Sequence, residues 1–282
     1  MKHFRRIALL LFLLPGLACA QQKIIDLQGP YALTLLGQRL NQLYQRQQPR
    51  VKIQVHGGSI RTALSLLHAG QTDIAQAQGV LAADDIRGLV AVPVGVEAIV
   101  FYVHDSNPIN ELTLAQVRGI YTGQFLNWKQ LGGPDQRILV FGGESTTGLG
   151  SFFSEAVLHG DDSFSYENKA STKDLLESIA AHPSGIGFSS VGFAPHVKAL
   201  RIRPSEGPAI EPTFTNIRQL KYPVARYVTW YFSQRPQGAL KDFCQWMFSS
   251  EGQLVVESVG FQPLLPEQRT SSLRKLGVSE GP

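Results

Sequence analysis

The chain has 282 residues and a mass of 31.0 kDa, and 43% of its residues are hydrophobic while 17% are charged. This composition is typical of globular proteins and excludes disorder for most of the chain. The length suffices for one large domain or two modest domains with a sizeable core. Lysines and arginines outnumber acidic residues by 26 to 22, which gives a net charge of +4 and an isoelectric point of about 9.1.

Most of this positive charge lies in the first twenty residues, which have the pattern of a signal peptide. Lys2, Arg5 and Arg6 precede an apolar run, and small residues follow it. The run is shorter than the ~20 apolar residues that a membrane-spanning helix needs. We expect cleavage after Ala20 and export to the periplasm or the medium. The three cations leave with the peptide, so the net charge falls from +4 to +1. Lipid attachment at Cys19 is the alternative.

The mature chain gives little support for nucleic-acid binding, because its net charge is small and it has no basic run. Loss of Cys19 would leave Cys244 as the only cysteine, which excludes an intrachain disulfide. Cys244 lies between Phe243 and Trp246 on a helical pattern of apolar residues. We therefore expect a buried and unreactive thiol.

Short β-rich runs alternate with longer amphipathic stretches, which predicts an α/β fold with largely parallel strands. In the first part of the chain the predicted strands cover 24–27, 51–55 and 73–75. Apolar residues at helical spacing cover 33–44 and 63–67. A β-branched run over 89–103 follows, and it is long enough to cross between two lobes.

Beyond this run the predicted helices begin at Thr113 and cover 152–158, 172–181 and 238–248, and the predicted strands cover 138–141 and 185–188. A second long β-rich run covers 222–232. Two long runs on either side of a central segment predict one lobe inserted into another. The predicted boundaries are 21–102 and 223–266 for the first lobe, 103–222 for the second lobe and 267–282 for a loosely ordered tail.

The chain lacks the motifs of the common enzyme and metal-binding classes. Its seven histidines do not follow the spacing of zinc ligands, and it has no nucleophile elbow, no Walker phosphate loop and no dinucleotide-binding glycine motif. We therefore expect no metal, no cofactor and no catalytic activity. His56, at a strand end, and Ser272, in a Ser-x-x-Lys sequence, are weak catalytic candidates, and a structural or surface role is the simpler interpretation of both.

Three polar, glycine-bearing segments each follow a predicted strand and precede a predicted helix, at 28–32, 56–61 and 143–150. The N-terminus of a helix offers unpaired N–H groups and a partial positive charge, so several of them around one cleft would form an anion site. Ligands of open α/β sheets bind at this edge of the sheet. For any one segment, ordinary helix capping by residues such as Ser59 is the simpler interpretation.

Several segments, taken together, resemble a known family. They are 51–78, 93–100, 114–133 with its Asn127-Trp128, 185–188, the Tyr-Pro-Val-Ala-Arg of 222–226, 250–253 and 260–264. In this order they resemble the periplasmic phosphate-binding proteins of phosphate ABC transporters, within the type II periplasmic-binding-protein superfamily. The resemblance extends from Ile24 to Leu265. It implies two α/β lobes, the second inserted into the first, that close on a ligand about two crossing strands near 96–103 and 224–230.

The three segments and the resemblance together suggest a set of ligand-binding residues, with Arg61 as the cationic partner. This set is Gly29, Tyr31, Gly58, Ser59, Arg61, Gln78, Glu144, Thr146, Thr147 and Gly148. The resemblance further implies that Glu144 accepts the hydrogen of a monoprotonated oxyanion. The chain departs from the family pattern where Gly143 stands in the place of an arginine, Leu149 in the place of a hydroxyl residue, and Pro30 supplies no N–H.

The expected function is that of an exported, monomeric binding protein that captures inorganic phosphate or another small oxyanion in the cleft between the lobes. The resemblance implies an inner-membrane ABC permease as its partner. The alternative is the same fold with a different solute, in a cleft lined by Tyr31, Gln78, Glu144 and Tyr121, or with a sensory or partner-binding role in the cell envelope.

Overall fold

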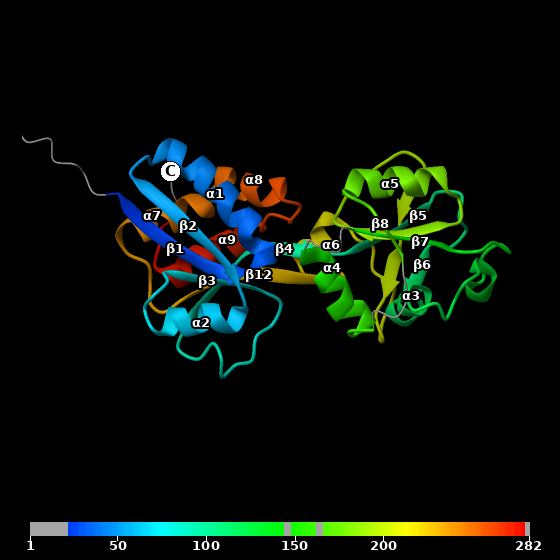
Figure 1. The fold of residues 1–282 in the computed structure, drawn as a ribbon, viewed down its shortest axis with the longest axis horizontal. Helices are drawn as coiled ribbons and strands as arrows, with labels where there is room; N and C mark the ends of the chain where they lie inside the picture. The colour runs from blue at the N-terminus through cyan, green and yellow to red at the C-terminus, as the bar shows by residue number, and fades with distance from the viewer. Residues whose placement is uncertain (1–21, 144–147, 162–165, 280–282) are drawn as a thin grey trace, which may run out of the picture.

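The computed structural model describes residues 22–143, 148–161 and 166–279. They form two α/β lobes that lie side by side and are connected by the strands β4 (Val90–Ala98) and β12 (Ala225–Phe232) (Figure 1). The predicted signal peptide and its cleavage site lie outside the described residues. No helix in the described ranges combines the length and the apolar character that crossing a membrane requires.

Lobe 1 contains a five-stranded sheet in the order β2-β1-β3-β12-β4. Strands β1 and β2 are parallel, β1 and β3 are parallel, and β12 runs antiparallel to both β3 and β4. Besides β4 and β12, the elements of this lobe are β1 (Lys23–Pro30), η1 (Tyr31–Leu33), α1 (Thr34–Gln47), β2 (Val51–Gly58), α2 (Ile60–His68), β3 (Ile74–Gln78), α7 (Gly238–Met247), α8 (Ser250–Ser258) and α9 (Pro266–Leu276).

The alternation of side chains along the strands builds the core of lobe 1 on both faces of the sheet. Ile25 and Leu27 belong to the main core with α1 and α7, whereas Ala75 and Ala77 pack with α2 in a smaller cluster. Cys244 on α7 is fully buried, which confirms the predicted burial, and burial raises the pKa of its thiol far above the usual range.

Lobe 2 contains a five-stranded sheet in the order β10-β5-β9-β7-β8 and a two-stranded sheet of β11 and β6. Its strands are β5 (Val100–His104), β6 (Glu111–Thr113), β7 (Leu139–Gly142), β8 (Glu167–Asn168), β9 (Gly185–Ser189), β10 (Val197–Ala199) and β11 (Arg201–Arg203). Its helical segments are α3 (Leu114–Tyr121), η2 (Trp128–Leu131), α4 (Gly148–Phe153), the π-helical turn η3 (Ser154–Leu158), α5 (Thr172–Ala181) and α6 (Phe214–Arg218).

Aromatic side chains fill the core of lobe 2. Phe153 and Phe188 stack with ring centroids 3.8 Å apart, and Tyr121 meets Phe153 edge to face at 4.7 Å. The hydroxyl of Tyr121 donates a hydrogen bond to the Phe141 carbonyl at 2.8 Å, and its side chain is fully buried. Tyr121 is therefore a core residue, and the expectation that it lines a ligand cleft is wrong.

The chain passes from lobe 1 to lobe 2 at Ile99, between β4 and β5, and it returns just before β12. The predicted boundary after residue 102 lies too late, because β5 pairs with β9 and β10 in the second sheet. The apolar run over 89–103 contains two strands that belong to different sheets, and composition alone does not reveal the division.

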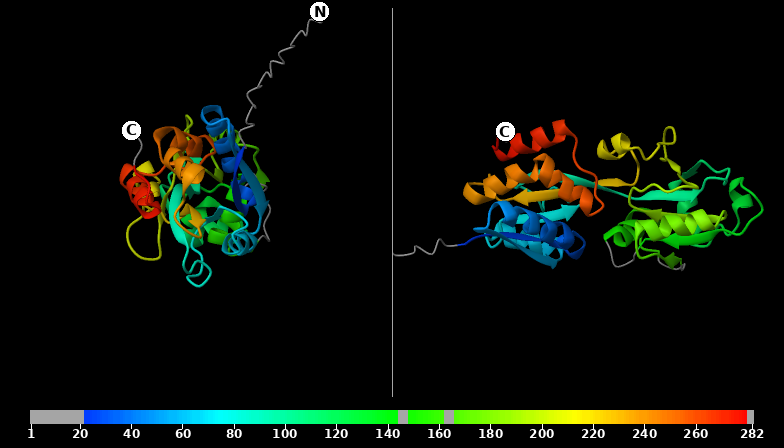
Figure 2. Two further views of the ribbon diagram at one scale, coloured as in Figure 1. Left: turned by 90° about the vertical axis from the view of Figure 1, so that its left-hand side faces the viewer. Right: turned by 90° about the horizontal axis from the view of Figure 1, so that it is seen from above.

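Residues 267–279 do not form the loosely ordered tail that the sequence suggests. They form α9, which begins with Pro266 and ends before Gly277 in a left-handed conformation (Figure 2, right). Leu273, Leu276 and Val278 are buried in the core of lobe 1. Ser272 is also buried and donates a hydrogen bond to the Pro93 carbonyl at 3.2 Å. The segment is mostly polar, so its few apolar residues were a weak helical signal.

Two of the three predicted polar loops belong to strands. The pairing of β1 with β2 continues to the register Pro30 opposite Gly58, so 28–30 and 56–58 remain part of the sheet. The helical turns then begin at once, at Tyr31 and Ile60. Glycines do not interrupt the ladder here, because the parallel neighbour supplies backbone partners up to the strand ends.

Candidate functional site

The carboxyl ends of seven strands meet between the lobes. In lobe 1, β4 ends at the crossing, and β1, β2 and β3 run in the same direction as β4. In lobe 2, β5 leaves the crossing, whereas β9, β7 and β8 run antiparallel to β5 and so end there. The N-termini of the helical segments that follow these strands therefore face the junction of the lobes, the usual ligand position in open α/β sheets.

A cavity of about 370 Å³ lies at this junction. Lobe 1 lines it with Tyr31, Ala32, Leu35, Leu36, Glu97, Ala98, Val259, Gly260 and Phe261. Lobe 2 lines it with Gly143, Gly148, Leu149, Ala170, Ser171, Thr172, Ser189 and Ser190. The lobe 1 wall is mostly apolar, whereas the lobe 2 wall carries a row of hydroxyl groups. Within the described part of the chain, Glu97 is the one charged side chain in the lining.

The hydroxyl groups of lobe 2 come from the end of β9 and the start of α5. Thr172 Oγ1 lies 2.7 Å from Ser189 Oγ and 3.0 Å from Ser190 Oγ. Ser171 caps α5, because its Oγ accepts a hydrogen bond from the Asp174 N–H at 3.1 Å. Thr172, Ser189 and Ser190 can both donate and accept hydrogen bonds, whereas the Ser171 hydroxyl donates to Asp174 Oδ2 at 2.8 Å. The first turn of α5 adds unpaired N–H groups and a partial positive charge.

Glu97 belongs to a buried ion-pair cluster at the crossing strands. Arg226 stands directly opposite Glu97 in the pairing of β12 with β4, and its Nε donates to Glu97 Oε2 at 2.7 Å. Gln78 Nε2 donates to the same oxygen at 2.9 Å. Arg226 also contacts lobe 2, since its Nη1 donates to Glu155 at 3.0 Å and its guanidinium lies 3.8 Å from the centre of the Phe152 ring.

Burial dominates the electrostatics of this cluster. The side chain of Glu97 is 4% exposed and that of Arg226 is 13% exposed. Loss of hydration raises the pKa of Glu97, and the nearby Arg226 charge and its hydrogen bond oppose that rise only in part. The carboxyl group therefore titrates above its usual range.

Of the predicted ligand-binding residues, Tyr31 and Gly148 line the cavity. A Cβ atom on Gly148 would lie 2.5 Å from the Ala32 Cβ, so glycine permits the close approach of α4 to η1 across the lobes. Glu144, Thr146 and Thr147 lie outside the described residues. Their contact with a ligand stays a prediction.

The other predicted residues do not line this cavity. Gly29 packs against Gln76 inside the sheet, and Gly58 ends β2. Ser59 Oγ accepts a hydrogen bond from the Thr62 N–H at 3.1 Å, so Ser59 caps α2, as the simpler interpretation of that residue predicted. Arg61 is exposed on the first turn of α2. Gln78 acts through Glu97, as described above.

Sequence reasoning missed Glu97, Arg226 and the hydroxyl row of lobe 2. A signal for Glu97 was present, because a carboxylate inside the apolar run 89–103 requires a buried partner. No signal in the sequence joined Thr172 to Ser189 and Ser190, since the contact depends on the pairing of β8 and β9 with β7.

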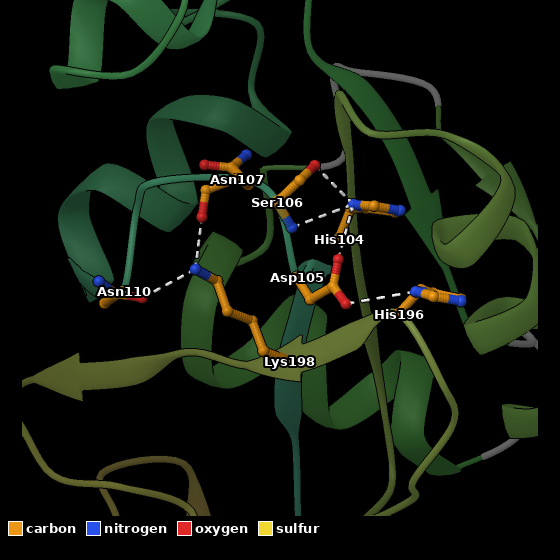
Figure 3. Close-up of polar contacts among 7 residues, drawn as sticks. All are labelled: His104, Asp105, Ser106, Asn107, Asn110, His196 and Lys198. Carbon is orange, nitrogen blue, oxygen red and sulfur yellow. Dashed lines mark hydrogen bonds and ion pairs between the residues drawn. The ribbon is translucent and has the colours of Figure 1, made fainter.

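A second polar cluster lies outside the cavity, at the end of β5 (Figure 3). Asp105 lies between His104 and His196, with nitrogen–oxygen distances of 3.2 Å and 3.4 Å. The two imidazole rings stack with centroids 6.2 Å apart. Lys198 donates to the Asn107 carbonyl and, at 2.8 Å, to Asn110 Oδ1. In the described ranges, no three or more histidine, cysteine or acidic side chains are arranged to hold a metal ion.

Two α/β lobes, two crossing strands and a cavity at the strand ends define the class of two-lobed binding proteins. The family model described as "PBP superfamily domain" matches residues 29–251. The chain belongs to this family. A curated relative, "Phosphate-binding protein PstS" of Pseudomonas aeruginosa, is 27% identical over 262 residues, covering 83% of this chain and 81% of the relative.

Solved structures confirm the fold. An "ABC-type phosphate transport receptor" from Vibrio cholerae superposes with a TM-score of 0.72 at 24% identity, covering 86% of this chain and 100% of that chain. A "possible phosphate binding protein" from Planctomyces limnophilus superposes with a TM-score of 0.79 at 18% identity, covering 91% and 98%. The predicted α/β architecture with an inserted second lobe is therefore confirmed.

Proposed function

We propose that this chain is an exported solute-binding protein that captures phosphate or a related oxyanion between its lobes for an ABC-type uptake system. Membership of the PBP superfamily and similarity to proteins named for phosphate binding support this proposal. The observation that carries it is the cavity at the strand ends, where Ser171, Thr172, Ser189 and Ser190 meet the N-terminus of α5. Hydroxyl groups and helix N–H groups are the donors that oxyanions require.

Recognition without a free cation in the described lining is physically reasonable. Hydrogen bonds to a charged group contribute more than neutral ones, roughly 1.5–3 kcal/mol each, so a few well-placed donors suffice for micromolar binding. The Arg226 charge is held by Glu97 and Glu155 and so is not available to an anion in this arrangement. Rotation about the crossing strands at Ile99 and before Ala225 would bring the hydroxyl row of lobe 2 onto a ligand held by lobe 1.

The proposal includes export as a monomer, binding without turnover and delivery to an inner-membrane permease. Among the described lining residues, the hydroxyl groups have no histidine or lysine beside them as a base, and the carboxyl group of Glu97 is paired with Arg226. The relatives named above are likewise binding or transport-receptor proteins by name.

A second candidate keeps the fold but changes the solute. Its support is Glu97, a carboxyl group in the cavity lining that is paired with Arg226. A carboxylate near a bound dianion is unfavourable, whereas it favours a neutral or cationic solute.

Calorimetric titration of the chain from Gln21 onward with phosphate, and in parallel with sulfate, tests the function. The protein is first unfolded and refolded to remove carried ligand. We expect micromolar or tighter phosphate binding. Absence of heat and of thermal stabilisation at millimolar phosphate would contradict the proposal and favour the second candidate.

Two variants on one helix locate the site. Thr172→Val removes a hydroxyl of the cavity, and we expect at least tenfold weaker phosphate binding, equivalent to about 1.4 kcal/mol. Ser178→Ala removes a hydroxyl of α5 that bonds to the Asp174 carbonyl and does not line the cavity, so its affinity should equal that of the parent. Equal losses in both variants would indicate a general effect on α5 rather than a ligand contact.

A further inference from the structure

The cavity is large for the ion that the proposed function assigns to it. Its volume of about 370 Å³ lies in the range of roughly 300–1,000 Å³ that pockets for small organic molecules occupy. An orthophosphate ion has five non-hydrogen atoms and fills a small part of such a space. In the present arrangement of the lobes, the cavity therefore offers contacts to atoms beyond a phosphoryl group.

The two walls of the cavity differ in chemistry. The lobe 2 wall carries the four hydroxyl residues at the start of α5 and the end of β9. The lobe 1 wall carries Leu35, Val259 and Phe261, together with Tyr31, whose ring packs over Gly57. A ligand can therefore place a polar group against the lobe 2 wall and an apolar group against the lobe 1 wall.

Part of the apolar wall is unusually exposed for side chains of its kind. Leu35 is 50% exposed and Tyr31 is 75% exposed, although the neighbouring Leu33 and Leu36 are fully buried. An apolar surface inside a concave site is a favourable contact for an apolar ligand group, because its transfer from water is favourable in proportion to the area covered.

We infer that the ligand is a phosphoryl compound with an apolar substituent, namely a phosphate monoester or a phosphonate. The phosphoryl oxygens accept hydrogen bonds from the lobe 2 hydroxyl groups and the α5 N-terminus, and the substituent lies against Leu35, Val259 and Phe261. This inference rests on the proposed function and adds the class of solute to it.

A titration series tests the inference with the chain from Gln21 onward. The ligands are orthophosphate, methylphosphonate, phenylphosphonate and phenyl phosphate, and the last two distinguish the carbon–phosphorus from the ester linkage. We expect phenylphosphonate or phenyl phosphate to bind at least tenfold more tightly than methylphosphonate, a difference of about 1.4 kcal/mol. If orthophosphate binds and neither phenyl ligand binds more tightly than methylphosphonate, the inference is wrong and the proposed function stands. If none of the four binds, the proposed function itself fails.

Matched variants of α1 show whether the substituent uses this wall. Leu35→Gln places an amide in the cavity, whereas Leu43→Gln makes the same change on α1 at a residue that is 36% exposed and does not line the cavity. We expect Leu35→Gln to weaken binding of the phenyl ligand about tenfold, and Leu43→Gln to leave the binding of both the phenyl ligand and orthophosphate unchanged. Val259→Ser is a second variant from a different element with the same expectation. Unchanged phenyl affinity in both cavity variants would overturn the inference.

Discussion

Glu97 with Arg226, at the crossing strands, and Asp105 with His104 and His196, at the other end of β5, are both clusters of acidic and basic side chains. Their nitrogen–oxygen distances are similar, 2.7 Å in the first and 3.2 Å and 3.4 Å in the second. Their burial differs, because the Glu97 side chain is 4% exposed whereas those of Asp105 and His196 are 49% and 71% exposed. In the second cluster only His104, at 14%, is largely shielded from water. Water screens the second cluster and not the first, so only the first is expected to affect stability strongly.

The largest expected effect follows from removing the buried cation. Arg226→Met leaves Glu97 buried with Gln78 as its remaining partner, and we expect the free energy of unfolding to fall by about 3 kcal/mol. Urea unfolding monitored by circular dichroism measures the change. Lys221→Met, which removes an exposed cation near the same crossing, is the control and should change stability by less than ~0.5 kcal/mol. Equal effects of the two substitutions would contradict the distinction by burial.

The next largest expected effect is a pH dependence of stability that arises from the titration of Glu97. Burial raises the pKa of Glu97 in the folded state above its value of ~4.3 in the unfolded chain. The folded state therefore binds more protons in the window between the two pKa values, and this contribution to stability is lost as the pH rises through that window. We expect the free energy of unfolding of the parent, relative to Glu97→Gln, to decrease from pH 4 towards neutral pH. An increase would mean that the pairing with Arg226 outweighs burial.

A smaller effect on stability is expected from changing Glu155, the exposed partner of Arg226 in the same cluster. Glu155 accepts from Arg226 at 3.0 Å, but its side chain is 75% exposed. Glu155→Gln should lower the free energy of unfolding by less than about 1 kcal/mol. Thermal unfolding in low and high salt provides the measurement, since a screened contact loses its contribution in high salt. A loss as large as that of Arg226→Met would show that the contact between Arg226 and lobe 2, rather than Glu97, holds the cluster together.

The smallest effect on stability is expected at the exposed His196. His196→Ala removes one partner of Asp105 at the end of β5, and we expect stability at pH 7 to change by no more than ~0.5 kcal/mol. His196 has a left-handed backbone conformation, with φ of 61°, so His196→Asn is the better control for the side chain alone. If His196→Asn lowered the free energy of unfolding by more than 1 kcal/mol, this cluster would contribute to stability to a degree comparable with the Glu97 cluster.

Most of the fold was predictable because apolar periodicity reports directly on buried faces. Helix α5 was predicted with its observed bounds, and Thr113 was recognised as the start of α3, where its side chain forms a capping box with Gln116. Helix α9 was missed, because a helix that buries only a few apolar residues has a weak pattern. The division of 89–103 between two sheets was also missed, since both of its strands are apolar on both faces.

The candidate site was less predictable than the fold. Ser59 and Arg61 have suitable chemistry and follow a strand end, yet they lie outside the cavity because α2 packs on the other face of the sheet from α1. The hydroxyl row and the Glu97 cluster depend on contacts between segments more than fifteen residues apart. Local patterns therefore identified which strand ends face the cleft, but of the described residues that line it they identified only Tyr31 and Gly148.

Because Cys244 is buried, the rate at which a reagent modifies its thiol measures the opening of the core of lobe 1. No solvent-borne thiol reagent reaches this side chain until α7 separates from the core of lobe 1. The rate of labelling in native buffer therefore reports how often that core opens, without denaturant and without an engineered cysteine. A ligand bound between the lobes would stabilise the folded state by mass action and so slow the labelling of Cys244. The labelling rate therefore reports ligand binding, although Cys244 itself has no role in it.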